Sequence, residues 1–497
     1  MSAGLKLHVK GFRVSGNTVF SDKQLLSLIS GHAGRVLGYS DLENLRDKLT
    51  YAYISAGYVS SGAVIPDQEM EDGVVEFQIV EGKLSEVVVN SKYFRESYFK
   101  KRLERTTGGV VNVHVLDEQL QLLQDDPRIR KVDAELLPGD ESGSAKLKLD
   151  VSEQKPFRAS LEANNYASPS IGAYTGGVRL GYDNAIGIGD AIDASFTVAE
   201  GLYFVAGGIE IPLNRYDTAL RLYGSYSESV IVDKDFDDLD IESESSTIGW
   251  SLIQPAYQSK NANLDVFFTG ERRRSKSFLL GDGWSFSPGV EDGVSKVSAL
   301  RFGADGVYRD RSQVFAARTT VSVGIDALVA TTNNDSGIAD GKFVSWLTQF
   351  QWARRFSFLD TLLIFHADLQ LSDDPLFGME QFSVGGHTSV RGYRENLFVS
   401  DNGVLLSLDA RVPILKRTDG SPVVQLGPIF DAGRVWSNSE QNSGPEWLYS
   451  IGLAGSWAIG DHADLSMSWS QELNNVDIGA EHDLQDSGFF FQLIARY

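Results

Sequence analysis

Residues 157–497 consist of short segments in which apolar and polar residues alternate, with turn residues between them. In residues 463–470, for example, Leu465, Met467 and Trp469 alternate with serines. This period of two gives a β-strand one apolar face and one polar face. Because no run of about eighteen apolar residues occurs in the chain, helical membrane spans are excluded, and a barrel of half-apolar strands fits a membrane instead.

The number of these segments predicts a membrane β-barrel of about 16 antiparallel strands, the even number that single-chain bacterial barrels have. We expect the strands to start near Phe157, Gly177, Ala191, Leu202, Tyr216, Thr247, Leu264, Lys296, Gln313, Lys342, Thr361, Gly403, Val423, Trp447, Ala463 and Gly488. If the first strand starts on the inner side, the long connections all lie outside, as in outer-membrane barrels. They are residues 230–246, 275–295, 329–341 and 373–402. A soluble β-sandwich is the alternative, but it has no need of this asymmetry.

Composition narrows the choice of partners. The 45 basic and 67 acidic residues give a net charge of -22, which argues against a nucleic-acid partner, because phosphate binding requires a basic surface. Cysteine is absent, which is common in envelope proteins that cross an oxidising compartment unfolded. Residues 1–12 lack the apolar core of a signal peptide, so either the chain is cytosolic or the numbering begins at an engineered mature terminus, and we expect the second.

Two small α/β units are predicted before the barrel, each with the order strand, helix, helix, strand, strand. In the first, Ser21 with Gln24 and Ser40 with Glu43 have the spacing of capping boxes that start helices. The predicted elements of the first unit are residues 5–14, 24–29, 42–56, 58–65 and 74–80. Those of the second are residues 87–90, 95–104, 116–124, 132–137 and 145–151. By itself a βααββ unit is also compatible with any small binding module.

Residues 383–400, SVGGHTSVRGYRENLFVS, lie between the alternating segments 361–372 and 403–412. A connection of some thirty residues is far longer than a hairpin requires, and loops of that length in ordered proteins are usually functional. The tetrapeptide Val390, Arg391, Gly392 and Tyr393 resembles the loop signature of the two-partner secretion outer-membrane transporters (TpsB type) of the POTRA-barrel superfamily. Residues 57–84, 123–139 and 427–436 (GPIFDAGRVW) resemble further phrases of the same family.

The resemblance implies a domain organisation. Residues 1–83 and 84–156 would be two periplasmic POTRA domains, and residues 157–497 the 16-stranded transmembrane barrel, with residues 373–402 as a long inserted loop. The family usually begins with a plug helix, whereas only a few residues precede Leu5 here. Either the chain was trimmed, or this member gates differently and the loop 383–400 is the remaining obstruction.

Alternation in residues 427–436 places Asp431, with Gly427 and Gly433, on the face that points into the lumen. In the family the loop folds back into the barrel and its arginine pairs with this aspartate, so the resemblance implies a pair of Arg391 and Asp431. A guanidinium drawn into a narrow lumen requires a carboxylate that accepts two parallel hydrogen bonds. Asp409 and Asp368, also predicted to be lumenal, are rival partners.

Three further features are interpreted more simply. The terminal Tyr497 resembles the signal by which outer-membrane barrels are recognised for insertion. Residues 233–246 place Asp233, Asp235, Asp237 and Glu244 at calcium-loop spacing, but Asp238 replaces the required glycine, so calcium is only the minor alternative. The run Arg272, Arg273 and Arg274 is interpreted as a surface anchor near lipopolysaccharide rather than as a nucleic-acid site.

Catalytic motifs are absent from the sequence: there is no P-loop, no HExxH and no GxSxG elbow. We therefore expect no enzyme, no cofactor and no metal. The resemblance implies an outer-membrane pore of a Gram-negative bacterium whose POTRA domains capture an unfolded exoprotein and whose barrel exports it to the cell surface. The implied partners are a large, β-helical adhesin or haemolysin-like exoprotein, outer-membrane lipid and the barrel-assembly machinery, with the chain itself a monomer. A barrel-assembly insertase and a passive porin are the alternatives.

Overall fold

The computed structural model describes residues 6–69, 72–107, 109–141, 143–233, 236, 239–333, 335, 337–439, 447–476 and 483–497. They form two compact units, Met1–Lys155 with Ile186–Ile188, and Pro156–Ala185 with Gly189–Tyr497. Within the described residues, no helix combines the length and apolar character needed to cross a membrane.

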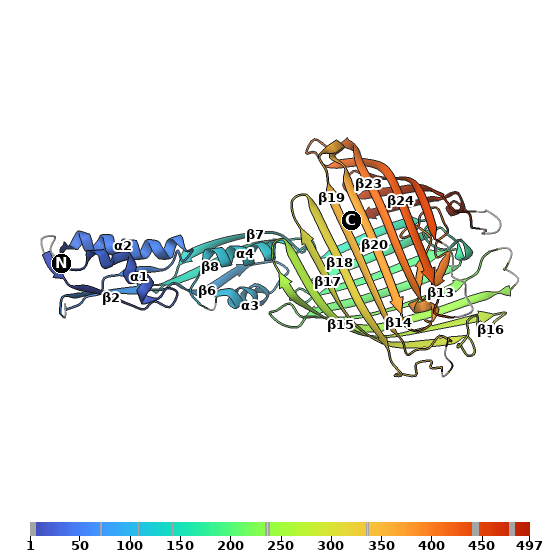
Figure 1. The fold of residues 1–497 in the computed structure, drawn as a ribbon, viewed down its shortest axis with the longest axis horizontal. Coiled ribbons are helices and arrows are strands. Elements are labelled where there is room, and N and C mark those ends of the chain that lie inside the picture. Colours follow the sequence, from blue (N-terminus) through green and yellow to red (C-terminus); the bar gives the residue numbers. More distant parts are fainter. Residues whose placement is uncertain are drawn as a thin grey trace. The chain divides into compact units, whose positions relative to one another are not determined.

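The first α/β domain contains two helices packed on a small sheet (Figure 1). Its elements are β1 (Lys6–Val9), β2 (Gly11–Ser15), α1 (Asp22–Ile29), β3 (Arg35–Gly38), α2 (Tyr39–Ser55), β4 (Gly62–Val64) and β5 (Val74–Val80). The main sheet has the order β2-β5-β4, with β2 parallel to β5, and β1 pairs separately with β3. The capping box of Ser21 and Gln24 is confirmed, because each side chain bonds to the backbone N–H of the other residue.

Three expectations for this domain are wrong in detail. The single strand expected over residues 5–14 is split into β1 and β2, and an unpredicted strand, β3, lies between the helices. Ser40 is not the N-cap of the second helix; Gly38 is, and the Asp41 carboxylate accepts a hydrogen bond from its N–H at 2.8 Å. The strand expected over residues 58–65 is reduced to β4, because Tyr58 and Ser61 form a turn closed by a backbone hydrogen bond.

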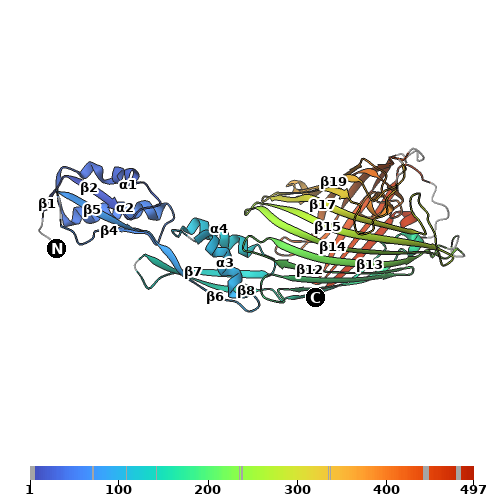
Figure 2. The same cartoon turned by 90° about the horizontal axis from the view of Figure 1, so that it is seen from below.

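The second α/β domain has the predicted order. Its elements are β6 (Lys83–Asn90), α3 (Glu96–Thr107), α4 (Val113–Gln124), β7 (Ile129–Pro138) and β8 (Ser144–Glu153). The sheet order is β6-β8-β7, and the helices pack on one side of it (Figure 2). Phe99, Leu103, Leu147 and Leu149 are fully buried between helices and sheet.

The second unit is a closed antiparallel barrel of 16 strands, which confirms the predicted fold class. Its strands are β9 (Phe157–Asn164), β10 (Thr175–Asp183), β11 (Ala191–Ala199), β12 (Leu202–Pro212), β13 (Ala219–Val230), β14 (Ile241–Gln258), β15 (Ala262–Leu279), β17 (Val294–Arg309), β18 (Gln313–Gly324), β19 (Val344–Arg355), β20 (Leu362–Ser372), β23 (Asn402–Lys416), β24 (Pro422–Trp436), β25 (Leu448–Ile459), β26 (Ala463–Glu472) and β27 (Phe489–Arg496). A two-residue strand, β16 (Asp282–Gly283), pairs antiparallel with the end of β15. The barrel closes where β27 pairs with β9.

Most barrel strands start within a few residues of the predicted positions. The clearest exception is β14, which begins at Ile241 instead of near Thr247. It continues as a ladder with β15 up to the pair of Ile241 and Leu279, so both strands are longer than expected. The sequence pattern does not predict these extensions, because they carry polar residues on both faces. A hairpin that extends beyond the lipid no longer needs an apolar face.

Candidate functional site

The long loop between β20 and β23 folds into the barrel lumen. It contains two short strands, β21 (Phe382–Val384) and β22 (Phe398–Ser400), which pair with each other. Val384, Val390 and Tyr393 are buried against Leu405, Val435 and Leu448 of the wall strands. The wall strands β20, β23 and β24 lie side by side in the barrel (Figure 1).

Strand β24 presents alternate faces, as its sequence predicts. Gly427, Ile429, Asp431 and Gly433 are buried, whereas Leu426 and Phe430 are exposed on the lipid side. Asp431 is completely buried although it carries a charge. A carboxylate in such a position requires a cation and several hydrogen bonds.

Arg391 supplies them. Its Nε donates to Asp431 Oδ2 and its Nη2 donates to Asp431 Oδ1, both at 2.7 Å. The backbone N–H of Arg391 donates a third bond to Oδ2 at 3.1 Å, and Ser407 Oγ donates to Oδ1 at 2.7 Å. The two side chains therefore form a bidentate pair with parallel hydrogen bonds, and the arginine side chain is only 12% exposed.

The rival carboxylates have other neighbours. Asp409 binds Arg411 at 2.8 Å and lies 3.8 Å from Arg391 Nη1, so it contributes a second, weaker attraction. Asp368 contacts His366 at 3.0 Å instead. Of the candidates named from the sequence, the structure brings Arg391 closest to Asp431.

The two glycines of β24 serve different contacts. A Cβ at Gly433 would lie 2.7 Å from Val390 Cγ2, so this glycine makes room for the loop tip. A Cβ at Gly427 would instead lie 1.6 Å from the carbonyl oxygen of Ala410 on β23. Gly427 thus permits close strand contact rather than space for the loop.

Gly392 and Tyr393 complete the loop tip. Gly392 has a φ of +101°, which favours glycine, and it lies against the backbone of Ser470. The Tyr393 hydroxyl lies 3.0 Å from the Tyr449 carbonyl oxygen and 2.7 Å from Asn474 Oδ1. Val390 has no exposed surface. The four residues of the tetrapeptide therefore contact β24, β25 and the end of β26.

A second ion-pair cluster holds the first half of the loop, and sequence reasoning missed it. Glu380 of the loop accepts from Arg301 Nη2 at 2.8 Å, and the same nitrogen lies 3.1 Å from Glu271. Arg273 Nη1 donates to the Met379 carbonyl oxygen at 2.7 Å. The side chains of Glu271 and Glu380 are 7% and 5% exposed. Its members lie far apart along the chain and form no motif, so nothing in the sequence indicates the cluster.

The second half of the loop has its own contacts. Arg394 forms an ion pair with Asp486, and the N–H of Glu395 donates to Gln485 Oε1 at 2.9 Å. Gln485 Nε2 also donates to the carbonyl oxygens of Asn165 and Ala167 at 2.7 Å, next to the seam of β27 and β9. The loop is thus also attached to the segment that leads into β27.

The remaining candidates lie elsewhere. Tyr497 is 80% exposed at the chain end and is not part of the loop site. Asp235, Asp237 and Asp238 of the acidic loop lie outside the described residues. Among the side chains that the structure describes, no group of three His, Cys, Asp or Glu residues is arranged to hold a metal ion.

Two family models match this chain. Residues 143–460 match the model of the haemolysin secretion/activation proteins ShlB/FhaC/HecB, and residues 7–82 match the ShlB-type POTRA domain. The outer membrane transporter CdiB of Dickeya dadantii is 21% identical over 450 residues, covering 88% of this chain and 77% of the relative. The hemolysin transporter protein HpmB of Proteus mirabilis is 21% identical over 293 residues, covering 55% and 49%.

Solved structures agree on the fold. CdiB from Escherichia coli superimposes with a TM-score of 0.72 at 20% identity, covering 99% of this chain and 91% of the other. BamA from Haemophilus ducreyi, lacking POTRA domains 1–3, gives 0.62 at 12% identity, covering 99% and 100%. The family places the barrel in the outer membrane of a Gram-negative bacterium and the POTRA domains in the periplasm. The chain belongs to the ShlB/FhaC/HecB family of haemolysin secretion and activation proteins, the outer-membrane transporters of two-partner secretion.

Proposed function

We propose that this chain captures one unfolded exoprotein through its POTRA domains and exports it through the barrel, with the lumenal loop as the gate. The observation that carries the proposal is the buried bidentate pair of Arg391 and Asp431. A passive pore has no use for a charged latch across its lumen. The relatives named CdiB and HpmB are transporters, and HpmB is named for hemolysin. A large β-helical adhesin or haemolysin-like protein is therefore the proposed cargo.

Capture would occur at sheet edges of the POTRA domains. Among the described residues, β7 pairs only with β8, and β2 pairs only with β5. Their outer edges carry backbone groups that an extended chain can bind by strand addition. Strand β7 carries Lys131, Asp133 and Glu135, and charged edge residues disfavour permanent pairing and aggregation. Such an edge suits a cargo that must be bound and then released.

The gate works through the attachment of the loop. While Arg391, Glu380 and Arg394 hold their partners, the loop occupies the lumen beside β24. Passage of a chain requires these contacts to loosen, and the cost is lowered if polar groups of the cargo and water replace them. The sequence contains no nucleotide-binding motif, so folding of the cargo outside the cell supplies the free energy in this proposal.

The test compares extracellular and outer-membrane proteomes of the source cell with the wild-type chain, without it, and with Arg391→Ala. The matched control is Arg417→Ala, because Arg417 lies exposed in the turn between β23 and β24. Loss of one large secreted protein in the deletion, but not in the control, supports export, and a changed amount of the same protein in Arg391→Ala supports the loop as its gate. Depletion of many outer-membrane barrels would indicate an insertase instead. No change in either fraction would favour a passive porin.

A further inference from the structure

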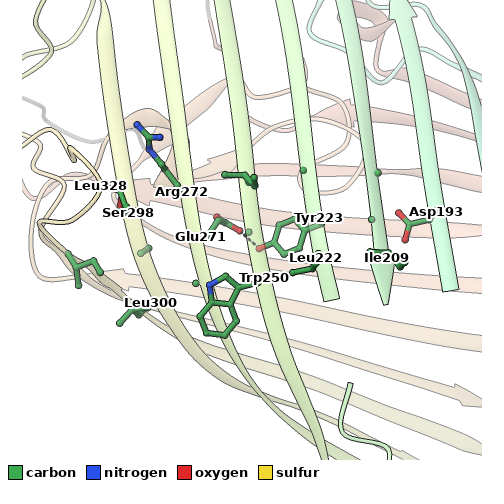
Figure 3. A pocket seen from close by; sticks show the side chains of 18 of the residues that line it. Asp193, Ile209, Leu222, Tyr223, Trp250, Glu271, Arg272, Ser298, Leu300 and Leu328 are labelled. Atoms are coloured by element: carbon green, nitrogen blue, oxygen red, sulfur yellow. Dashed lines mark hydrogen bonds between the residues drawn. The ribbon is translucent and has the colours of Figure 1, made fainter. Parts of the chain in front are cut away.

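The lipid-facing wall from β11 to β17, with the loop that follows β18, contains a groove of about 930 Å³. Figure 3 shows its lining, with the hydrogen bond of Tyr223 and Glu271 drawn as a dashed line. Those two side chains face the lumen, whereas the residues directly before and after each of them on its strand face outward. Directly paired residues share a face, so the register Leu222, Trp250, Gly270, Leu300 forms one outward row.

Glycines form the floor of the groove. Gly207 is paired with Gly224 in one outward row, and Gly270 lies under the indole of Trp250. Because no side chains rise from these positions, a depression remains between Trp250 and the rim. Most of the other lining side chains on this face are apolar: they are Ile192, Ile209, Leu222, Ile248, Leu300, Ile325 and Leu328. The shape and lining suit an acyl chain.

A strained apolar loop forms one rim of the groove. Leu328 and Val329, which follow β18, have φ angles of +51° and +63° and are 67% and 74% exposed. Such backbone angles are unfavourable for Leu and more so for a β-branched residue. Ser298 Oγ donates to the Ala327 carbonyl oxygen at 2.8 Å and holds the loop against β17. Two exposed apolar side chains on strained backbone are consistent with a binding role.

Cations lie at the outer end of the same face. The outward positions of β15 change from apolar Leu264, Val266 and Phe268 to Arg272 and Arg274. β15 runs outward from the short turn that follows β14, so these arginines lie toward the extracellular interface. The run of three arginines is therefore divided between two faces, with Arg273 bonded to the lumenal loop.

Among the described residues, these cations have no anionic partner within ion-pair distance. Arg274 is paired directly with Lys296 on β17, and like charges directly opposite each other destabilise a sheet. Within the described part of the chain, no carboxylate lies within ion-pair distance of Arg272, Arg274 or Lys296. Arg272 Nε is buried and has no hydrogen-bond partner among the described residues, and Arg272 lines the groove. The nearest carboxylate by register, Glu244, is paired with Lys276, and Glu228 is paired with Glu244 on its other side.

We propose that this groove is a specific site for a phosphorylated, acylated lipid of the outer leaflet, with lipid A as the occupant. One acyl chain lies over Gly270 and Trp250, and a phosphate is bound by Arg272, Arg274 and Lys296. A phosphate accepts parallel hydrogen bonds from a guanidinium and offsets the repulsion of the paired cations. The site fixes the barrel in the asymmetric membrane from its outer side and does not depend on the export proposal.

The test uses the purified full chain in zwitterionic detergent and native mass spectrometry with two probes, bis-phosphorylated lipid A and the same lipid without phosphate. The wild type is expected to bind the phosphorylated probe at least tenfold more tightly. In Arg272→Gln/Arg274→Gln this preference is expected to disappear while binding of the dephosphorylated probe is unchanged. The control Arg354→Gln removes an exposed, outward cation from β19 at the opposite membrane interface and should keep the preference.

Folding of each variant is checked by its migration in unheated gels, and Arg274→Gln alone serves if the double variant does not fold, because Arg274 is exposed. Equal binding of both probes by the wild type would overturn the proposal. An equal loss in Arg354→Gln would do the same, since it would show a general charge effect. Displacement of the lipid by millimolar inorganic phosphate would show a plain anion site without an acyl component.

Discussion

At the residue scale, the pair of Arg391 and Asp431 determines where the loop tip lies. A buried carboxylate alone is unstable, and here it accepts bonds from two nitrogens of one guanidinium, a backbone N–H and Ser407. Removing one partner leaves the other buried without compensation, which costs about 3 to 5 kcal/mol where water is excluded. Removing either partner therefore destabilises the docked position of the loop relative to the undocked one.

Asp431→Asn keeps the volume of the side chain but removes its charge. We expect the loop to leave its docked position more often, so that open events in planar bilayers become at least tenfold more frequent. Asp419→Asn is the control, because Asp419 lies exposed in the turn between β23 and β24 and accepts hydrogen bonds from Ser421, away from the loop. Unchanged gating in Asp431→Asn would show that the charge of Asp431 does not hold the loop.

A second residue-scale prediction concerns the second POTRA domain, where Asp126 binds Arg128 and the Tyr98 hydroxyl at 2.8 Å. Burial raises the pKa of Asp126, but the bonds and charge of Arg128 outweigh it and hold the pKa below its usual 3.8. The carboxylate therefore stabilises the fold above about pH 4, and this contribution is lost as the pH falls through the lowered pKa.

Asp126→Asn should reduce the stability of this domain by about 1 to 3 kcal/mol at pH 7, because hydrogen bonds to a charged group are lost. The difference from wild type should shrink below pH 4. Amide hydrogen exchange of β7 in the full chain measures it, with the exposed Asp133→Asn as control. A difference that stays constant down to pH 3 would contradict the assigned role of the Asp126 charge.

The sequence could indicate Arg391 and Asp431 because each lies in a short motif that resembles the family. It could not indicate the cluster of Arg301, Glu271 and Glu380. These residues lie far apart along the chain, and each is an ordinary charged residue in its own segment. Only the register of β15 with β17, combined with the folded loop, brings them together.

At the element scale, the loop fits against β24 because Gly433 has no side chain at the position where Val390 of the loop packs. Gly433→Ala would place a Cβ 2.7 Å from Val390 Cγ2. We expect looser docking and more frequent open events, at a cost of about 1 to 3 kcal/mol typical of overpacking. Val390→Ala in the same chain should reverse most of the effect, since it removes the clashing methyl group.

The control for this pair is Gly378→Ala in the same loop, where an added Cβ meets nothing within 4 Å. Bilayer recordings compare the four chains. If Gly433→Ala gates like wild type, or if Val390→Ala fails to restore it, steric fit at this position does not control the loop.

Element boundaries were predictable where one strand face is apolar, as in β26 and β27. They were not predictable above the membrane, because the outer parts of β14 and β15 carry polar residues on both faces. In the first POTRA domain, the second helix begins at Tyr39, where the Asp41 carboxylate accepts from the N–H of Gly38. The spacing of Ser40 and Glu43 also fits a capping box, so the sequence pattern predicted the wrong N-cap.

At the scale of the whole molecule, the lumenal loop of the proposed transporter is an obstacle that must leave the lumen during export. The chain contains no cysteine, so an introduced pair has no competitor. A Cβ at Gly433 would lie 3.5 Å from Val384 Cβ, a separation that a disulfide spans at about 3.5 to 4.5 Å. Val384→Cys with Gly433→Cys, together with Val390→Ala to make room, therefore locks the loop to β24.

The decisive measurement is secretion by cells carrying this locked chain, under oxidising conditions and after addition of a reductant. Chains with either cysteine alone and Val390→Ala are the controls and should secrete in both conditions. We predict that the oxidised lock lowers the secreted exoprotein at least tenfold and that the reductant restores it. Full secretion through the oxidised, locked barrel would contradict the gate.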